Sequence, residues 1–224
     1  MSKEALKTKK QRVKKVVHLL KRYHPKADCA LYHKNPVQLL VATVLSAQCT
    51  DKRVNQVTKT LFKKYPTAKA FASANLRELE QEIHSTGFFR SKAQNIKAAC
   101  QKIQKEFKGK VPSRLEDLLT LPGVGRKTAH VILGTAFQIS SGVVVDTHVR
   151  RLSNRLHFTN SKDPEKIEKD LNYLLPKKEW IYFSHALILH GREVCKARAP
   201  RCNTCFLEEF CPKKGVEKRY MGSV

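Results

Sequence analysis

Apolar residues recur every three or four positions along most of this chain, which is the spacing of amphipathic α-helices. Clear examples are Val13 to His24, Leu76 to Gly87 and Ser91 to Phe107. The one run of β-like composition, Gly142 to Val145, is too short to imply a sheet. The sequence therefore predicts an all-α fold.

Several helix ends carry local signals. Asn35-Pro36 precedes an apolar run and is typical of a helix start. Ser113 and Glu116 fit a capping box, and Asp146 is placed as the N-cap of the helix that follows it. Gly191 is suited to end the helix that begins near residue 180.

The chain has 224 residues and a formal net charge of +25. Such an excess indicates a polyanionic partner, with nucleic acid as the first expectation. A basic membrane-surface protein is the alternative, but the cations are spread along the whole chain rather than along one amphipathic segment. No apolar run reaches the roughly 18 residues of a membrane span. The N-terminus has no apolar segment of a signal peptide, so we expect an intracellular protein, in the cytoplasm or nucleoid.

The stretch "LPGVGRKTAHVIL", residues 121–133, indicates a glycine hairpin that opens a helix. The backbone of Gly123, Val124 and Gly125 can approach an anion closely, and Arg126 adds positive charge. A DNA phosphate fits this pattern and would position a duplex without reading its sequence. The alternative is a simple turn between two helices; the net charge favours phosphate binding.

Lys127 lies at the positive end of that helix, where a carboxylate would be more comfortable. It is either a second phosphate contact or a nucleophilic amine, and the sequence alone leaves both open. Asp146 follows nineteen residues later at the head of the next helix. A capping aspartate is held ionised, and an ionised carboxylate is what a developing sugar cation or a protonated amine needs.

Four cysteines near the C-terminus follow the spacing C-x6-C-x2-C-x5-C within seventeen residues. They are Cys195, Cys202, Cys205 and Cys211. Their closeness indicates a metal centre; one pair flanked by single cysteines resembles an iron–sulfur run more than the two tight pairs of a zinc site, although zinc stays open. The other cysteines, Cys29, Cys49 and Cys100, are expected to be plain buried thiols.

The segment between the first two of these cysteines is basic. It contains Lys196, Arg198 and Arg201. A loop tied at both ends by a metal centre would make a rigid phosphate contact. The alternative is a solvated run of charge.

Together with the cysteine spacing, the motifs "LSAQCTDKRVN", "LPGVGRKTAHVIL", "VVVDTHVRRLSNRL" and "LILHGREVC" resemble the endonuclease III family of base excision DNA glycosylases, from about Val13 to about Lys213. The resemblance implies a monomer with two helical domains. Residues 29–140 would form a six-helix domain with a helix-hairpin-helix. Residues 1–28 and 141–224 would form a second domain, in which the four cysteines bind a 4Fe-4S cluster.

The resemblance also implies the reaction. The enzyme would flip a damaged base out of double-stranded DNA. Lys127 would attack C1′ of the sugar, expel the base and form a Schiff base, and β-elimination would then nick the strand, also at abasic sites. Asp146 would activate the lysine and stabilise positive charge, and Gln48 would fill the gap left by the flipped nucleotide.

One position departs from the family pattern. Phe88 stands where the family commonly has a leucine wedge, and a phenyl ring can also stack into the duplex. We expect oxidised pyrimidines of the thymine glycol type as substrates. One alternative is a monofunctional mismatch glycosylase, although such relatives generally lack a lysine at the Lys127 position. The other is a non-catalytic helix-hairpin-helix module that binds DNA through Lys127 and uses Asp146 only as a cap.

Overall fold

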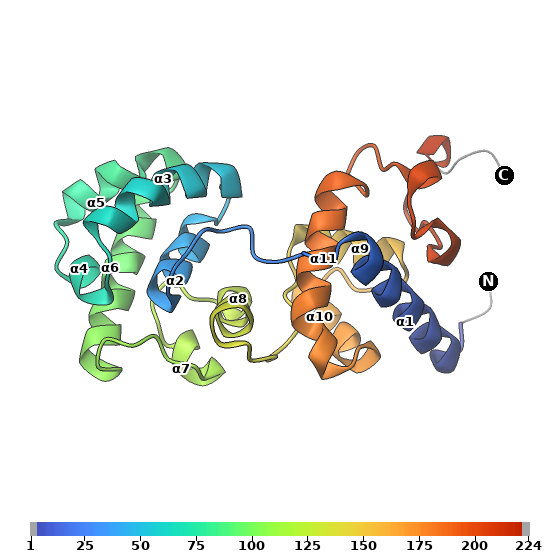
Figure 1. Ribbon diagram of the computed structural model, residues 1–224, viewed down its shortest axis with the longest axis horizontal. Helices are drawn as coiled ribbons and strands as arrows, with labels where there is room; N and C mark the ends of the chain where they lie inside the picture. Colours follow the sequence, from blue (N-terminus) through green and yellow to red (C-terminus); the bar gives the residue numbers. More distant parts are fainter. Residues whose placement is uncertain (1–3, 221–224) are drawn as a thin grey trace. The chain divides into compact units, whose positions relative to one another are not determined.

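The computed structural model describes residues 4–220, and Figure 1 shows that its regular elements are helices. The prediction of an all-α fold is confirmed. Val143 to Val145 is extended chain without strand pairing. Across the described residues, no helix is both long and apolar enough to cross a membrane.

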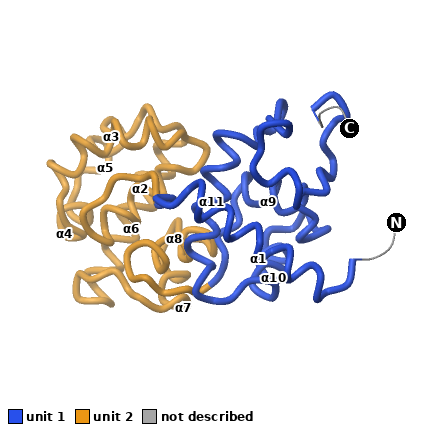
Figure 2. The backbone as a smooth tube through the Cα atoms, turned by 45° about the vertical axis from the view of Figure 1, so that its right-hand side comes forward, with its two compact units in different colours: residues 1–28, 142–224 blue, residues 29–141 orange. Residues whose placement is uncertain are grey.

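Cys29–Ser141 form one compact unit, drawn in orange in Figure 2. Its helices are α2 (Pro36–Leu45), α3 (Asp51–Lys64), α4 (Ala68–Ala72), α5 (Leu76–Ile83), α6 (Phe89–Glu106), α7 (Leu115–Leu119) and α8 (Arg126–Phe137). They close around a core of aliphatic side chains and Phe71, and α2 is buried along almost its whole length. This accounts for the apolar run at 37–45, in which only Gln38 and Thr43 are polar, because a helix surrounded by others needs no polar face.

The other unit joins residues 4–28 of the described chain to the C-terminal part from Gly142. Its helices are α1 (Leu6–Tyr23), α9 (Thr147–Arg155), α10 (Pro164–Leu174) and α11 (Trp180–Glu193). Short 3-10 turns follow at Cys202–Thr204, Glu208–Phe210 and Lys218–Tyr220. The buried face of α1, with Val16 and Leu20, belongs to the same core as Phe183 and Leu187 of α11.

Two of the four predicted helix signals are correct. Asn35 caps α2 by accepting a hydrogen bond from the Gln38 N–H, and Asp146 caps α9. The capping box at Ser113 is wrong. Arg114 is the N-cap of α7, so the Ser113 hydroxyl lies one residue too early, after the buried Val111-Pro112 pair.

Gly191 does not end its helix, since α11 continues to Glu193. Gly191 is buried, and a Cβ atom there would lie 2.8 Å from Nδ1 of His148 and 3.0 Å from its Cβ. The glycine is needed because α9 packs closely against this point of α11, and local sequence does not reveal that contact.

Candidate active site and cysteine cavity

The segment Leu121–Gly125 forms the tight connection between α7 and α8. Gly123 has φ +75°, and a Cβ atom there would lie 2.8 Å from Cβ of Asn95, so the position requires glycine on two counts. Val124 is buried and its N–H donates to the Leu121 carbonyl at 3.1 Å. Gly125, the N-cap of α8, is exposed and open: an added Cβ would meet nothing within 4 Å. The hairpin is therefore anchored on one side and accessible at the start of α8.

Lys127 is the second residue of α8, next to Arg126, and both are exposed. The first turn of this helix contains no Asp or Glu, and its glycine cap has no side chain to accept the first N–H groups. This end of α8 thus presents its positive dipole together with two cations, which suits an anionic ligand.

Asp146 is half-buried at the N-terminus of α9, where Oδ1 accepts a hydrogen bond of 2.8 Å from the Val149 N–H. The extended chain before it is held by side chains of the neighbouring helices. The N–H of Val143 donates to Oδ1 of Asn172, and that of Val144 donates to Oγ of Ser184. These bonds replace a strand partner and fix the approach to Asp146.

Helix α9 also connects Asp146 with the first cysteine of the cluster motif. Nη2 of Arg151 donates to the carbonyls of Gly191 and Cys195, each at 2.9 Å, and lies 3.2 Å from Nδ1 of His148. Burial lowers the pKa of His148, while the Asp146 carboxylate opposes this effect. Arg151 was not singled out from the sequence, because nothing in "THVRRLSNR" tells which arginine faces inward.

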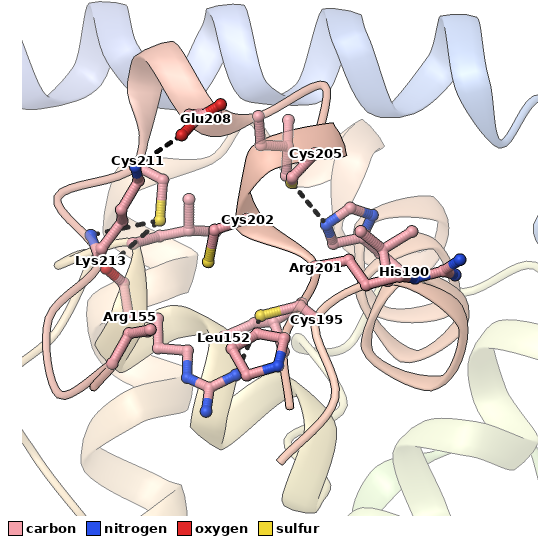
Figure 3. Close-up of a pocket in the computed structure, with 15 residues that line it drawn as sticks. Leu152, Arg155, His190, Cys195, Arg201, Cys202, Cys205, Glu208, Cys211 and Lys213 are labelled. Atoms are coloured by element: carbon pink, nitrogen blue, oxygen red, sulfur yellow. Dashed lines mark hydrogen bonds and ion pairs between the residues drawn. The ribbon is translucent and has the colours of Figure 1, made fainter. Parts of the chain in front are cut away.

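The four cysteines line one cavity together with Leu152, Arg155, His190 and Leu207 (Figure 3). About 430 Å³ of it is free of protein atoms, including part of the solvent at its mouth. In Figure 3 the four sulfur atoms face a common space. Over residues 4–220, His, Cys, Asp and Glu side chains form no group of three or more placed to bind a single metal ion.

Burial raises the pKa of the Cys205 thiol to about 12 and that of Cys211 to about 11, and it also raises the pKa of Cys202. The nearness of the other sulfurs acts in the same direction. Thiolates at these positions therefore need a cationic group to balance them, and an iron–sulfur or metal centre provides one. The chemistry of the donor set fits such a group.

Several donors surround the sulfur atoms. The Arg155 guanidinium is buried, with Nη1 at 3.2 Å from Sγ of Cys195 and donating to the Lys196 carbonyl at 2.7 Å. Nε2 of His190 lies 3.4 Å from Sγ of Cys205, and the Lys213 N–H donates to Sγ of Cys211 at 3.4 Å. Hydrogen bonds of this kind stabilise thiolate ligands and tune iron–sulfur centres.

The predicted basic loop projects from the edge of this cavity. Lys196, Arg198 and Arg201 are all exposed, and Arg201 also donates from Nη2 to the Glu193 carbonyl. Arg155 donates to the carbonyls of Lys196 and Ala197, so the loop is held to the end of α9. Lys196 and Arg198 present their charges to solvent.

Gln48 and Phe88 lie on two loops of the unit 29–141. Both are exposed, Phe88 by 66%, and both have a left-handed backbone, with φ 52° and 48°. Of the cysteines expected to be plain buried thiols, Cys100 is buried, and Cys29 and Cys49 are half-buried.

Comparisons with known proteins identify the family and the fold. Residues 41–177 match the model of the HhH-GPD superfamily base excision DNA repair proteins. The chain is 57% identical to endonuclease III of Synechocystis over 92% of its length and 94% of that protein. A solved non-covalent endonuclease III–DNA complex superposes with a TM-score of 0.87 at 44% identity, covering 91% of this chain and 95% of that one. A trapped endonuclease III–DNA covalent intermediate gives 0.87 at 43% identity, covering 91% and 96%.

Proposed function

Since the chain belongs to the endonuclease III family of HhH-GPD base excision DNA repair proteins, we propose that Lys127 and Asp146 carry its chemistry. The chain is a DNA glycosylase with an associated abasic-site lyase activity. The observation that carries the assignment is the exposed amine of Lys127 at an open, acid-free helix N-terminus. The covalent intermediate formed by a related endonuclease III supports a nucleophilic amine.

In the proposed reaction, Nζ of Lys127 attacks C1′ of the damaged nucleotide, and the bond from C1′ to the base breaks with its electron pair leaving on the base. Asp146 accepts the proton lost by the amine and stabilises the positive charge on the sugar. The sugar ring of the adduct then opens: the C1′–O4′ bond breaks, O4′ takes up a proton, and C1′ forms a Schiff base with Nζ of Lys127. The Schiff base acidifies the C2′ hydrogen, and loss of that proton forms a C2′=C3′ double bond and expels the 3′ phosphate by β-elimination. The carboxylate is available in a fixed orientation because Oδ1 accepts the hydrogen bond from the Val149 N–H.

The partner is double-stranded DNA. The hairpin Gly123, Val124, Gly125 with Arg126 would hold a backbone phosphate, and Lys196, Arg198 and Arg201 would hold further phosphates. Gln48 would fill the gap left by the extruded nucleotide, and Phe88 would stack into the duplex as a wedge, since both are exposed on loops. Binding chromosomal DNA implies that the protein works inside the cell.

The substrate class is an oxidised pyrimidine such as thymine glycol. A saturated ring stacks poorly, so the cost of flipping it out of the duplex is small. A monofunctional mismatch glycosylase has no need of an amine at position 127, and a simple binding module would have no use for Asp146 beyond its cap.

Cys195, Cys202, Cys205 and Cys211 would hold a 4Fe-4S cluster. This assignment is supported by four half-buried cysteines that line one cavity, and by the raised pKa values of Cys202, Cys205 and Cys211, whose thiolates need a cationic group. The cluster would tie residues 195–211 together, where short turns replace regular helix. We expect yellow-brown protein with about four iron and four sulfide per chain. A colourless zinc protein with the same melting behaviour would contradict the assignment.

Borohydride trapping on duplexes with one thymine glycol, one abasic site or one G·T mismatch tests the reaction. The Lys127→Ala variant should lose the trapped adduct and strand cleavage by about a thousandfold or more, since no other group replaces the nucleophile. The matched control is Arg126→Ala, which should weaken DNA binding but still form the adduct. An adduct at wild-type yield from Lys127→Ala would refute the assignment, and an adduct on the abasic duplex alone would refute the substrate class.

A further inference from the structure

The loops that carry Gln48 and Phe88 come from different parts of the unit 29–141. Gln48 follows α2, and Phe88 precedes α6 as its N-cap residue. Both residues have left-handed φ values, which are uncommon for side chains other than glycine and persist only where neighbouring structure holds them. Something must therefore fix each loop from within the protein.

Lys92 makes contact with both loops. Its side chain is only 5% exposed, and Nζ donates to the Leu45 carbonyl at 2.9 Å and to the Thr86 carbonyl at 2.8 Å. Leu45 is the last residue of α2, three residues before Gln48, and Thr86 lies two residues before Phe88. One ammonium group thus joins the roots of the two loops.

The Thr86 end of this link is itself rigid. Thr86 is buried, and its hydroxyl donates to the Ile83 carbonyl at 2.8 Å. At the other end, the Leu45 carbonyl belongs to the last turn of α2, where carbonyls lack helical partners. A movement of either loop would break a bond to the same nitrogen.

Burying an ammonium is unfavourable unless its protons are bonded, and an apolar side chain of equal length would fill the space at lower cost. We propose that Lys92 is a positioning residue that sets the separation of the Gln48 and Phe88 loops, so that both side chains enter the duplex around the extruded nucleotide together. This inference rests on the proposed function of Gln48 and Phe88. Lys92 touches neither DNA nor the reacting atoms in this role.

The test compares Lys92→Met with Lys105→Met, which removes the same charge from an exposed position of α6. We expect Lys92→Met to lower single-turnover excision of thymine glycol about tenfold or more, because small displacements of positioning groups are costly. Trapping at a preformed abasic site should change less than about threefold, since no base has to be unstacked there. Lys105→Met should match the wild type in both assays. Equal losses on the two duplexes would overturn the inference.

A second experiment separates this inference from the function on which it rests. If Lys92 acts through the two loops, adding Lys92→Met to the Gln48→Ala/Phe88→Ala variant should cost little more excision than that variant alone. A full additional loss would overturn the role of Lys92 and leave the loops their function. Wild-type excision by the Gln48→Ala/Phe88→Ala variant would instead refute the proposed function of the loops.

A third measurement covers the case in which Lys92→Met does not fold. Lys92→Gln retains one donor group, and its amides at residues 46–49 and 86–89 should exchange with deuterium faster than in the wild type, while those of α8 do not change. Unchanged exchange at both loops would overturn the inference.

Discussion

Helices α8 and α9 begin at Arg126 and Thr147, and their N-termini are built in opposite ways. The start of α8 is open: its cap is Gly125, and Arg126 and Lys127 add positive charge to the positive dipole. The start of α9 is closed, because the carboxylate of Asp146 accepts the Val149 N–H and occupies the place of an external anion.

The difference shows that a helix N-terminus can either bind an external anion or orient a carboxylate of the protein itself. An open N-terminus leaves its N–H groups and field for a phosphate that comes from the ligand. At a closed N-terminus the N–H groups bond to the protein's own carboxylate, which is thereby a negative charge in a fixed orientation. Lys127, the proposed nucleophile, therefore lies at the helix N-terminus that is open to a DNA phosphate. Asp146, the proposed acid–base group, lies at the helix N-terminus that its own carboxylate caps.

After removal of the Lys127 amine, the largest expected effect comes from separating the charge of Asp146 from its capping role. Asparagine caps a helix as well as aspartate, so Asp146→Asn should fold normally and lower thymine glycol excision about a hundredfold. Asp146→Ala should lose a similar factor and, in addition, about 1 kcal/mol of unfolding free energy. Single-turnover kinetics and thermal melting measure the two quantities.

The comparison of the two variants decides between the roles. If Asp146→Asn keeps wild-type excision while Asp146→Ala loses stability, Asp146 is only a cap. Asp163→Asn, at the cap of α10 where Oδ1 accepts from the Glu165 N–H, is the matched control and should change neither quantity.

A smaller effect is expected from closing the open N-terminus of α8. Gly125 has φ −89° and free space around it, so Gly125→Asp can form a cap without strain. The new carboxylate should raise the Kd for duplex DNA about tenfold at low salt, because it competes with the phosphate. Gly125→Ser, an uncharged cap, is the control, and fluorescence anisotropy at several salt concentrations is the measurement. Equal Kd values for the two variants would show that no phosphate binds at this helix end.

Helix starts were predictable where the signal is local. Asn35 and Asp146 cap their helices through bonds to residues three positions away, which sequence spacing can encode. The predictions at Ser113 and Gly191 are wrong because tertiary packing decides those helix ends. The chain is still buried at Val111-Pro112, so α7 begins only after Arg114, and His148 of α9 packs against Gly191 within α11.

In the candidate site, too, the features encoded by local spacing were predictable and those set by tertiary packing were not. Cysteine spacing predicted residues that do line one cavity, because all four lie within a short segment. The buried cations were missed, since lysine and arginine are normally read as exposed. A usable signal existed for Lys92, which lies four residues before Ile96 and so continues the apolar face of α6. For Arg155, which reaches carbonyls 41 and 42 residues away, no local pattern points inward.

The smallest expected effect is a change in the unfolding free energy at acidic pH, caused by His148 near the closed N-terminus of α9. Burial lowers the pKa of His148 below its value of 6.5 in an unfolded chain. Below pH 6.5 the unfolded state therefore binds more protons than the folded one, and stability falls until the folded pKa is also passed. His148→Gln should remove this part of the acid sensitivity, so its unfolding free energy should drop less than that of the wild type between pH 7.5 and pH 5. Urea titrations at the two pH values measure the difference, and parallel losses in both proteins would show that His148 is not kept neutral beside Asp146.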